Sequence, residues 1–243
     1  MDITDRIALV TGGATRVGRA LTYALAEAGA DVFVHYNSSA GPAEKMAEDV
    51  RGLGRRSATG AANLSDPSAA GDLIAQAEAA LGPVSILVNS ASGFPEDTLM
   101  DVELDRWHDT LNLTLASPIF LTQAFARALP DDMEGAVVNV TDVKTQTPYL
   151  KRFSYMIAKG GIDTFTRAAA LALAPRIRVN AVALGVILPP PGEGDDYAAK
   201  LASRLPLQRV GGTDPVAGAV VALVENDFVT GEILRLDGGG HLV

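Results

Sequence analysis

The sequence predicts an α/β protein built on one doubly wound parallel sheet of about seven strands, with helices on both faces. Short apolar runs of strand length alternate with helix-length segments along the whole chain, which is typical of a parallel sheet. The run at 86–88 is apolar without alternation, as expected for a strand that is buried on both faces. No internal repeat or linker interrupts the alternation, so residues 1–243 are expected to form one domain.

The strands are expected, in chain order, at 7–10, 31–36, 57–61, 86–88, 136–140, 177–183 and 232–236. The helices are expected at 17–28, 43–53, from 66, 104–129, 153–173, 197–204 and from 214. Gly29 ends the first helix. Asp66-Pro67 and Asp214-Pro215 each supply a capping oxygen and a proline for the first helical turn. Pro118 lacks an amide hydrogen and should break the long helix.

Residues 188–196 contain three consecutive prolines and two glycines, which disfavour regular structure. A loop at about 187–205 would lie over the carboxyl ends of the strands, where open α/β sheets bind ligands. It is expected to be either a substrate lid or an ordinary connection.

The composition disfavours several classes of partner. A net charge of −9 and a pI near 4.8 argue against nucleic acid and anionic membranes, which attract basic surfaces. The acidic start and the lack of a long apolar run predict a cytoplasmic protein with no membrane span. With no cysteine and three scattered histidines, no metal site is expected.

The segment Thr11–Gly18 follows the first strand and opens the first helix. Gly12 permits a tight turn, and Gly18 allows close packing while free amides face a phosphate. The segment is therefore expected to bind a dinucleotide's pyrophosphate, which makes the fold Rossmann-type. Arg16 would place a cation beside the pyrophosphate and the mouth of the site; the alternative is a solvated arginine.

The end of the second strand predicts which dinucleotide binds. A carboxylate there would bond a ribose 2′-hydroxyl and repel a 2′-phosphate, yet residues 35–43 contain no acid. His35, Asn37, Ser38 and Ser39 offer neutral or cationic donors instead, which favours NADP(H) over NAD(H). Alternatively these are only turn residues and the enzyme is indifferent to the phosphate.

Tyr155 and Lys159 lie one helical turn apart, so they share a face of the helix. We expect the ammonium to lower the pKa of the phenol and make Tyr155 the proton donor, and Lys159 also to bond the nicotinamide ribose. Asp142 follows a strand and should lie nearby. A carboxylate repels a developing alkoxide but suits a substrate with N–H donors, which points away from simple ketone reduction. The alternative is that Asp142 only caps a turn.

Polar and aromatic residues follow the fourth strand and complete the expected site. Phe94 could stack on a flat substrate, although a core position is the alternative, and Ser92 could bond the substrate's edge. Asn112 is a polar residue in an apolar helix and is expected to hold a water near Lys159. The expected catalytic residues are Asp142, Tyr155, Lys159 and Asn112. The expected cofactor-binding residues are Gly12, Thr15, Arg16, Val17, Gly18, His35, Tyr36, Asn37, Ser38, Ser39, Asn63, Leu64, Asn89, Ser90, Ala91, Tyr155, Lys159, Gly185 and Ile187.

These motifs make the chain resemble a short-chain dehydrogenase/reductase over nearly its whole length. It is most similar to the branch of pteridine and dihydromonapterin reductases. The closer match is carried by Arg16, Asn89-x-Ala91-Ser92-x-Phe94, Asp142 in place of a serine, and Tyr155-x-x-x-Lys159. The resemblance implies that Phe94 stacks the pterin, that Arg16, Ser92 and Asp142 line its polar edge, and that Tyr155 takes part in proton delivery. It also implies a homotetramer.

Four positions depart from the family pattern. Ser38 stands where that branch often has an arginine for the 2′-phosphate, and Asn63 stands in place of an aspartate. Ser90 replaces the second asparagine of an Asn-Asn-Ala-Gly turn. Leu184 replaces a proline after the sixth strand, which affects how Ile187 meets the nicotinamide.

The sequence thus predicts an NADPH-dependent reductase of a dihydropterin or related pteridine. Hydride would reach a ring C=N, and a proton would be relayed through Tyr155 and Asp142. Two alternatives are a carbonyl or 3-oxoacyl thioester reductase and a non-catalytic protein that senses NADP(H).

Overall fold

The computed structural model describes residues 1–189 and 195–243. The described residues form a seven-stranded sheet in the order β3-β2-β1-β4-β5-β6-β7. Every neighbouring pair of strands is parallel. The strands are β1 (Ile7–Val10), β2 (Asp31–Tyr36), β3 (Ser57–Ala61), β4 (Ile86–Asn89), β5 (Gly135–Asp142), β6 (Ile177–Leu184) and β7 (Ile233–Leu236). The predicted doubly wound sheet is confirmed.

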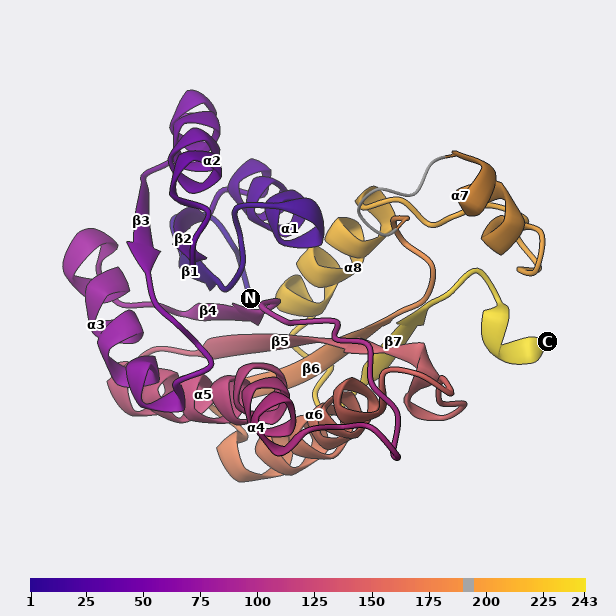
Figure 1. Cartoon of the computed structure of the whole chain (residues 1–243). Coiled ribbons are helices and arrows are strands. Elements are labelled where there is room, and N and C mark those ends of the chain that lie inside the picture. Colours follow the sequence, from indigo (N-terminus) through magenta and orange to yellow (C-terminus); the bar gives the residue numbers. More distant parts are fainter. Residues whose placement is uncertain (190–194) are drawn as a thin grey trace.

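Helices cover both faces of this sheet (Figure 1). They are α1 (Arg16–Glu27), α2 (Ala40–Gly52), α3 (Ala70–Leu81), α4 (Leu104–Leu111), α5 (Ser117–Ala128), α6 (Phe153–Leu173), α7 (Asp195–Ala202) and α8 (Asp214–Glu225). Helices α1, α2 and α8 lie on one face, and α3 to α6 lie on the other. Because side chains alternate along a strand, Ala8 and Val10 enter the first core while Ile7 and Leu9 enter the second.

The long helix expected over 104–129 is divided into three parts. Between α4 and α5, residues Asn112–Ala116 form a π-helical turn directly before Pro118. Pro118 has no N–H for the carbonyl of Thr114, and its ring would clash with that carbonyl in a regular helix. The break near Pro118 is therefore confirmed, and Asn112 lies at the first residue of the widened turn. Such turns are frequent at functional sites.

Several predicted boundaries were wrong by a few residues. Helix α2 begins at Ala40 instead of 43, because Pro42 fits within a first helical turn. Strand β5 continues to Asp142, so this carboxylate is carried by the strand itself. Helix α7 lies two residues earlier than expected, at Asp195–Ala202. Part of the proline-rich segment predicted over 188–196 lies outside the described residues.

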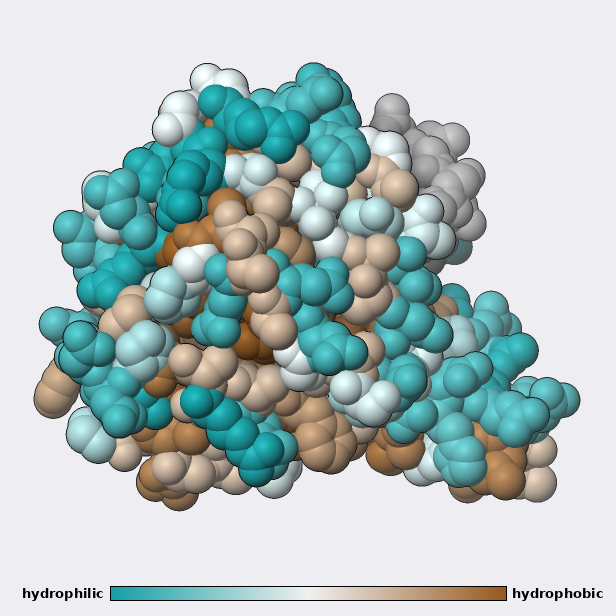
Figure 2. Space-filling model, turned by 90° about the vertical axis from the view of Figure 1, so that its left-hand side faces the viewer, coloured by the Kyte–Doolittle hydropathy of each residue, from teal (hydrophilic) through white to brown (hydrophobic). Residues whose placement is uncertain are grey.

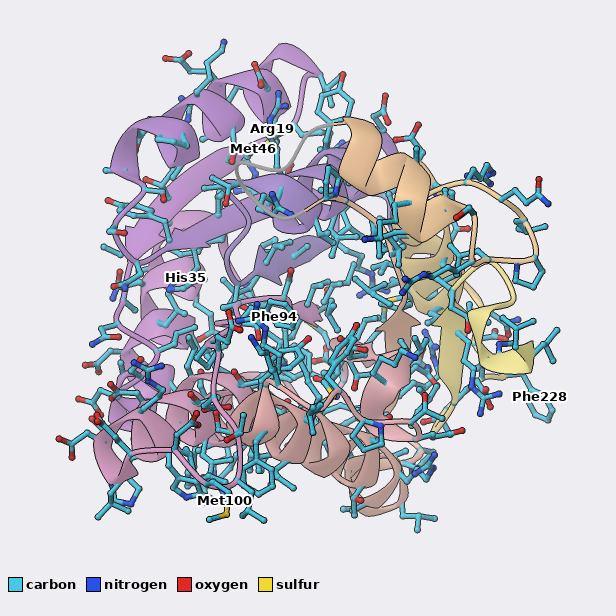
Figure 3. The ribbon with its side chains drawn as sticks, turned by 45° about the vertical axis from the view of Figure 1, so that its right-hand side comes forward. Arg19, His35, Met46, Phe94, Met100 and Phe228 are labelled. Carbon is cyan, nitrogen blue, oxygen red and sulfur yellow. The ribbon has the colours of Figure 1, made fainter. Side chains whose placement is uncertain are left out.

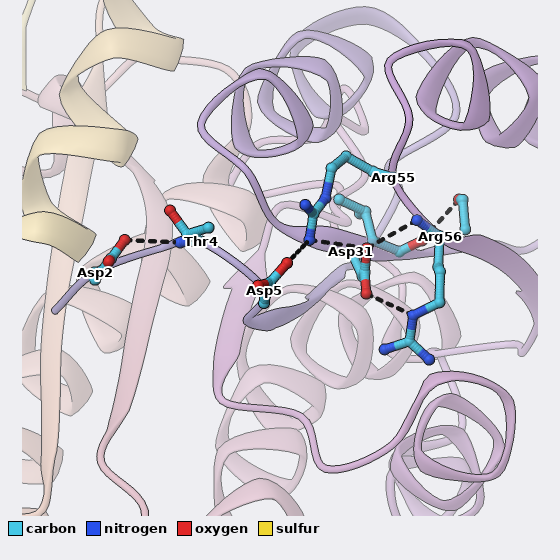
Figure 4. Close-up of polar contacts among 8 residues, drawn as sticks. Asp2, Thr4, Asp5, Asp31, Arg55 and Arg56 are labelled. Atoms are coloured by element: carbon cyan, nitrogen blue, oxygen red, sulfur yellow. Dashed lines mark hydrogen bonds and ion pairs between the residues drawn. The ribbon is translucent and has the colours of Figure 1, made fainter.

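A charged cluster fastens the amino-terminal edge of the sheet (Figure 4). Asp31, the first residue of β2, accepts hydrogen bonds from the Arg56 backbone N–H at 2.8 Å and from its Nε at 2.7 Å. Arg55 bridges Asp31 at 3.2 Å and Asp5 at 2.7 Å. These charges lie at the amino ends of the strands and serve the fold, since ligands bind at the opposite edge.

The molecule's side with α2, β3 and α3 presents charged and polar side chains around a smaller apolar area (Figure 2). Within residues 1–189 and 195–243, no helix has the length and apolar character needed to cross a bilayer.

Candidate active site

A cavity of about 420 Å³ opens at the carboxyl ends of β1, β2 and β4. The strand order reverses between β1 and β4, which is where doubly wound sheets bind ligands. Its lining includes Gly12, Ala14, Thr15, Arg16, Val17, Gly18, His35, Tyr36, Asn37, Ser38, Ser39, Asn63, Leu64, Ser65, Ser90, Ala91, Ser92 and Leu113. The structure therefore brings most of the expected cofactor-binding residues together around one cavity.

The phosphate loop is shaped for a close-packed anion. A Cβ at Gly18 would lie 2.1 Å from the carbonyl oxygen of Gly12, so only glycine fits there without backbone movement. Gly12 has φ +62°, a conformation that favours glycine. Thr15 makes no side-chain cap to α1, which leaves the amides of the first turn free for a phosphate. These features fit the pyrophosphate of a nicotinamide dinucleotide.

His35 braces this loop from within the protein. Its Nδ1 accepts the Gly12 N–H at 3.0 Å, so the opposite nitrogen, Nε2, carries the proton that faces the Ala62 carbonyl at 3.0 Å. Burial lowers the pKa of His35 below its usual value, which keeps the ring neutral. The expectation that His35 offers a donor to the cofactor was wrong, because both ring nitrogens are engaged by the protein.

The end of the cavity expected to hold the cofactor's ribose and adenine has no acidic residue in its described lining. Asn37 and Ser38 are exposed at the cavity, and none of the described lining residues is acidic. Asn63 uses its side-chain oxygen to accept the Ser65 N–H at 3.0 Å, which leaves the amide N–H groups free to donate. Leu64 is buried beneath them. The described lining therefore contains no carboxylate that would repel a 2′-phosphate.

Arg16 joins the phosphate loop to the segment that follows β6. Its Nη2 donates to the carbonyl of Pro189 at 2.9 Å, and its backbone has φ +50°. Arg16 is exposed and lines the cavity. Its contact with the pyrophosphate stays a prediction.

Asn89 differs from expectation. Its side chain points into the interior, where Nδ2 donates to Asn139 Oδ1 at 2.9 Å, and it does not line the cavity. The turn after β4 is held instead by Thr11, whose hydroxyl oxygen lies 2.9 Å from the Ser90 N–H and 3.0 Å from the Ala91 N–H. Thr11 was missed, although it opens the glycine motif.

The predicted proton-donating group is assembled between β5 and α6. The hydroxyl of Tyr155 donates to Asp142 Oδ2 at 3.1 Å, and Asp142 Oδ1 accepts the Lys144 N–H at 2.8 Å. Asp142 therefore caps a turn and also accepts the tyrosine hydroxyl, so it does more than cap. Its contact with a substrate stays a prediction. Lys159 is buried, donates from Nζ to the Val140 carbonyl at 2.7 Å and lies 5.6 Å from the centroid of the Tyr155 ring.

The electrostatics of this group correct one prediction. The pKa of Tyr155 is raised well above its usual value, first by burial and then by the Asp142 carboxylate, instead of being lowered by Lys159. Burial also raises the pKa of Asp142 and lowers that of Lys159 to about 8. Tyr155 thus remains a protonated phenol at neutral pH, which is the form that a proton donor requires.

Phe94, labelled in Figure 3, is next to Tyr155 and is not a core residue. Its ring is 50% exposed and meets the Tyr155 ring edge-on, with centroids 4.8 Å apart. The guanidinium of Arg152 lies 4.2 Å from the Phe94 ring centroid and donates to the Phe94 carbonyl at 2.8 Å. A flat substrate therefore has an exposed aromatic ring available beside the phenol.

The loop that carries Phe94 is fastened to the start of α6. Asp97 is buried and accepts the Ser154 N–H at 3.1 Å and the Ser154 hydroxyl, while its carbonyl accepts the Arg152 N–H at 2.7 Å. Asp97 thereby caps the helix that carries Tyr155. Neither Asp97 nor Arg152 was singled out from the sequence, because the contact spans more than fifty residues and follows no local pattern.

The other predicted residues lie around this centre. Ser92 Oγ is 3.4 Å from Thr114 Oγ1, which directs it toward the π-helical turn that begins at Asn112. Ile187 is buried, and a Cβ at Gly185 would lie 2.7 Å from the Cα of Asp237. Neither residue lines the cavity, so their contact with the cofactor stays a prediction.

Comparisons with known proteins agree with this architecture. Residues 12–241 match the family model described as enoyl-(acyl carrier protein) reductase. The chain is 34% identical over 247 residues to an uncharacterized oxidoreductase of Mycobacterium tuberculosis, covering 98% of this chain and 92% of that protein. It is 31% identical over 248 residues to the 3-oxoacyl-[acyl-carrier-protein] reductase FabG of Escherichia coli, covering all of both chains.

A solved structure is also similar. FolM alternative dihydrofolate reductase 1 from Brucella canis, complexed with NADP, superposes with a TM-score of 0.93 and 36% identity, covering 100% of this chain and 97% of that chain. The fold and the site together define an oxidoreductase that uses a nicotinamide dinucleotide. The chain belongs to the short-chain dehydrogenase/reductase family.

Proposed function

We propose that this enzyme is an NADPH-dependent reductase of a dihydropterin or a related pteridine. The observation that carries the proposal is the buried pair of Asp142 and Tyr155, 3.1 Å apart and next to the exposed ring of Phe94. A carboxylate at this point suits N–H donors of an amino-substituted ring, and it would repel the alkoxide that forms when a ketone is reduced. The similarity to an alternative dihydrofolate reductase supports the same substrate class.

The bound nicotinamide would supply the hydride. The residues of this chain hold the rest of the chemistry: Phe94 offers its ring to the flat substrate, and Asp142 accepts the substrate's N–H groups. Tyr155 keeps its proton until hydride transfer makes a ring nitrogen basic, and then donates it. Asp142 can relay a proton in this step because burial raises its pKa and so favours its protonated form. In this proposal Lys159 bonds the nicotinamide ribose, and Asn112 holds a water between the π-helical turn and Lys159.

NADPH is the proposed reductant because the ribose end of the cavity has exposed neutral donors and no acid. Asn37, Ser38 and Ser39 line that end, and a 2′-phosphate would meet no described carboxylate in the lining. Similar structures that contain NADP support this choice.

A second candidate function is reduction of a carbonyl such as a 3-oxoacyl thioester. The 31% identity with the Escherichia coli 3-oxoacyl reductase favours it. The discriminating experiment follows NADPH oxidation with dihydrobiopterin, dihydromonapterin, dihydrofolate and acetoacetyl thioester side by side. We expect turnover of at least one pteridine; turnover of the thioester alone would reverse the assignment.

We also propose that the enzyme assembles with copies of itself, as a homotetramer. Large apolar side chains are exposed on helices that pack beside the site and near the last strand. They include Phe120, Ile157, Leu171 and Phe228, of which Phe228 is 98% exposed and, like Met100, lies at the margin of the molecule (Figure 3). Light scattering after size exclusion should give four times the chain mass of 25.2 kDa, and a monomer mass would contradict the proposal.

A further inference from the structure

Asp163 is a charged residue beside the active site that the proposed function leaves without a role. It lies on α6, one helical turn after Lys159 and two turns after Tyr155, and therefore on the same face of that helix. Its side chain is half-buried. No substrate or cofactor needs to touch it for the chemistry described above.

Both carboxylate oxygens of Asp163 are bonded to the segment that carries Asp142. Oδ1 accepts the hydroxyl of Thr141 at 2.6 Å, and Oδ2 accepts the hydroxyl of Thr145 at 2.7 Å. Thr141 directly precedes Asp142, and Thr145 ends the short turn that follows it. The two hydrogen bonds therefore fix the chain on both sides of Asp142 against α6, the helix that carries Tyr155.

Asp163 also acts on Lys159 through its charge. Lys159 is buried, and the charged or titratable groups near it are Asp142 from β5 and Tyr155 and Asp163 from α6. Burial disfavours the ammonium, while the two carboxylates favour it. The Asp142 carboxylate accepts the Tyr155 hydroxyl and takes part in the proposed proton relay. Asp163 takes no part in that relay, so its negative charge remains available to Lys159.

We propose that Asp163 is a positioning residue of the reduction: it clamps residues 141–145 onto α6 and supplies the second negative charge that keeps Lys159 an ammonium. The proposal concerns the shared reductase site and holds for a pteridine or a carbonyl substrate. It adds a role that acts through Lys159 and Asp142 and not by contact with the reactants.

The test is Asp163→Asn, which keeps the size of the side chain and removes its charge. Lys159 has a pKa of about 8, so kcat/KM of the wild type should fall above that pH. Loss of the neighbouring charge should move this alkaline limb to lower pH by roughly one unit. Relative to the wild type, activity should then drop roughly tenfold at pH 9 but only about twofold at pH 7.

Thr145→Val is the matched control, because it removes one arm of the clamp and leaves the charge in place. We expect a lower kcat with the alkaline limb at its wild-type pH. If the limb of Asp163→Asn stays where the wild type has it, the proposal is overturned. Should Asp163→Asn fail to fold, Asp163→Glu keeps the charge on a longer arm; it should lose kcat without moving the limb, and a moved limb contradicts the proposal.

A second readout uses the cofactor-free protein. The difference in free energy of unfolding between wild type and Asp163→Asn should shrink as pH rises from about 7 to about 8. Over that range Lys159 loses its proton first in the folded variant and then in the folded wild type, where Asp163 had stabilised it. The same difference for Thr145→Val should stay flat. A flat difference for Asp163→Asn would reduce Asp163 to a structural hydrogen-bond acceptor and refute its effect on Lys159.

Discussion

At the scale of the residue, one hydrogen bond sets the chemistry of the site. Burial raises the pKa of the Tyr155 phenol, and the Asp142 carboxylate, which accepts its hydroxyl at 3.1 Å, raises it further. Tyr155 therefore holds its proton across the physiological range. In the proposed function Tyr155 donates that proton, and Asp142 selects the substrates that receive it.

Removing the hydroxyl tests the donor. Tyr155→Phe should lower kcat by roughly 10²–10⁴-fold, the usual contribution of a positioned acid. Binding of NADPH, followed by nicotinamide fluorescence, should remain nearly unchanged because Tyr155 is not among the residues that line the cavity with the phosphate loop. A variant that retains the wild-type rate would exclude Tyr155 as the donor.

Asp142→Ser tests the specificity. A hydroxyl can still bond the Tyr155 hydroxyl but cannot hold several N–H donors as a carboxylate does, so kcat/KM for a dihydropterin should fall by at least about tenfold. Reduction of acetoacetyl thioester should fall less or rise. Steady-state kinetics with both substrates measure the ratio, and equal losses would count against the proposed role of the carboxylate.

At the scale of the element, the turn from β1 into α1 has no spare room. A Cβ on Gly18 would meet the Gly12 carbonyl oxygen at 2.1 Å, so Gly18→Ala must displace backbone. We expect a loss of roughly 1–3 kcal/mol in the free energy of unfolding, typical of overpacking, and weaker NADPH binding. Chemical denaturation and fluorescence titration measure the two effects.

Gly218→Ala is the control for that change. Gly218 lies within α8, and nothing lies within 4 Å of where its Cβ would be. Alanine there should stabilise the protein by about 0.4–1 kcal/mol and leave NADPH binding unchanged. If Gly18→Ala instead leaves stability and NADPH binding as Gly218→Ala does, the turn from β1 into α1 can make room for a Cβ.

The elements also show what a sequence can and cannot predict. Strand β4 is a local apolar run, and the structure has it where it was expected. Asp66 caps a 3-10 turn over Pro67–Ala69, as its sequence predicts, but α3 itself begins only at Ala70. Tyr155 and Lys159 were found because helix spacing places them on one face. Asp163 extends the same spacing and could have been found in that way.

Contacts between distant segments were not predictable from the same patterns. Asp97 caps α6 from a loop more than fifty residues earlier, and the two ring nitrogens of His35 are taken by Gly12 and Ala62 only once the strands are paired. The direction of the Tyr155 pKa also depended on burial, which spacing alone does not show. Lys159 lies one helical turn from Tyr155, but burial of the phenol decides the direction of its pKa.

At the scale of the whole molecule, cofactor binding should stabilise the fold. The cavity is lined from β1, β2, β3 and β4 and the start of α1, so a dinucleotide would join segments across half of the sheet. A ligand at a hundred times its Kd contributes about 2.7 kcal/mol, which corresponds to a rise in Tm of roughly 5–10 °C for a chain of this length.

The two dinucleotides should differ in this effect. With no acid in the described lining near Ser38, NADPH should raise Tm more than NADH at the same concentration. Differential scanning fluorimetry makes the comparison directly. An equal or larger shift with NADH would argue that the turn after β2 does not distinguish the phosphate.

The hydrogen bond from Arg16 to the Pro189 carbonyl has a kinetic consequence. Arg16 lines the cavity expected to hold the dinucleotide and also bonds the chain that leaves β6, so we expect a bound dinucleotide to change this contact before the second substrate binds. We therefore expect an ordered mechanism, in which NADPH binds before the second substrate. Dead-end inhibition patterns would reveal that order, and Arg16→Ala should relax it toward random entry.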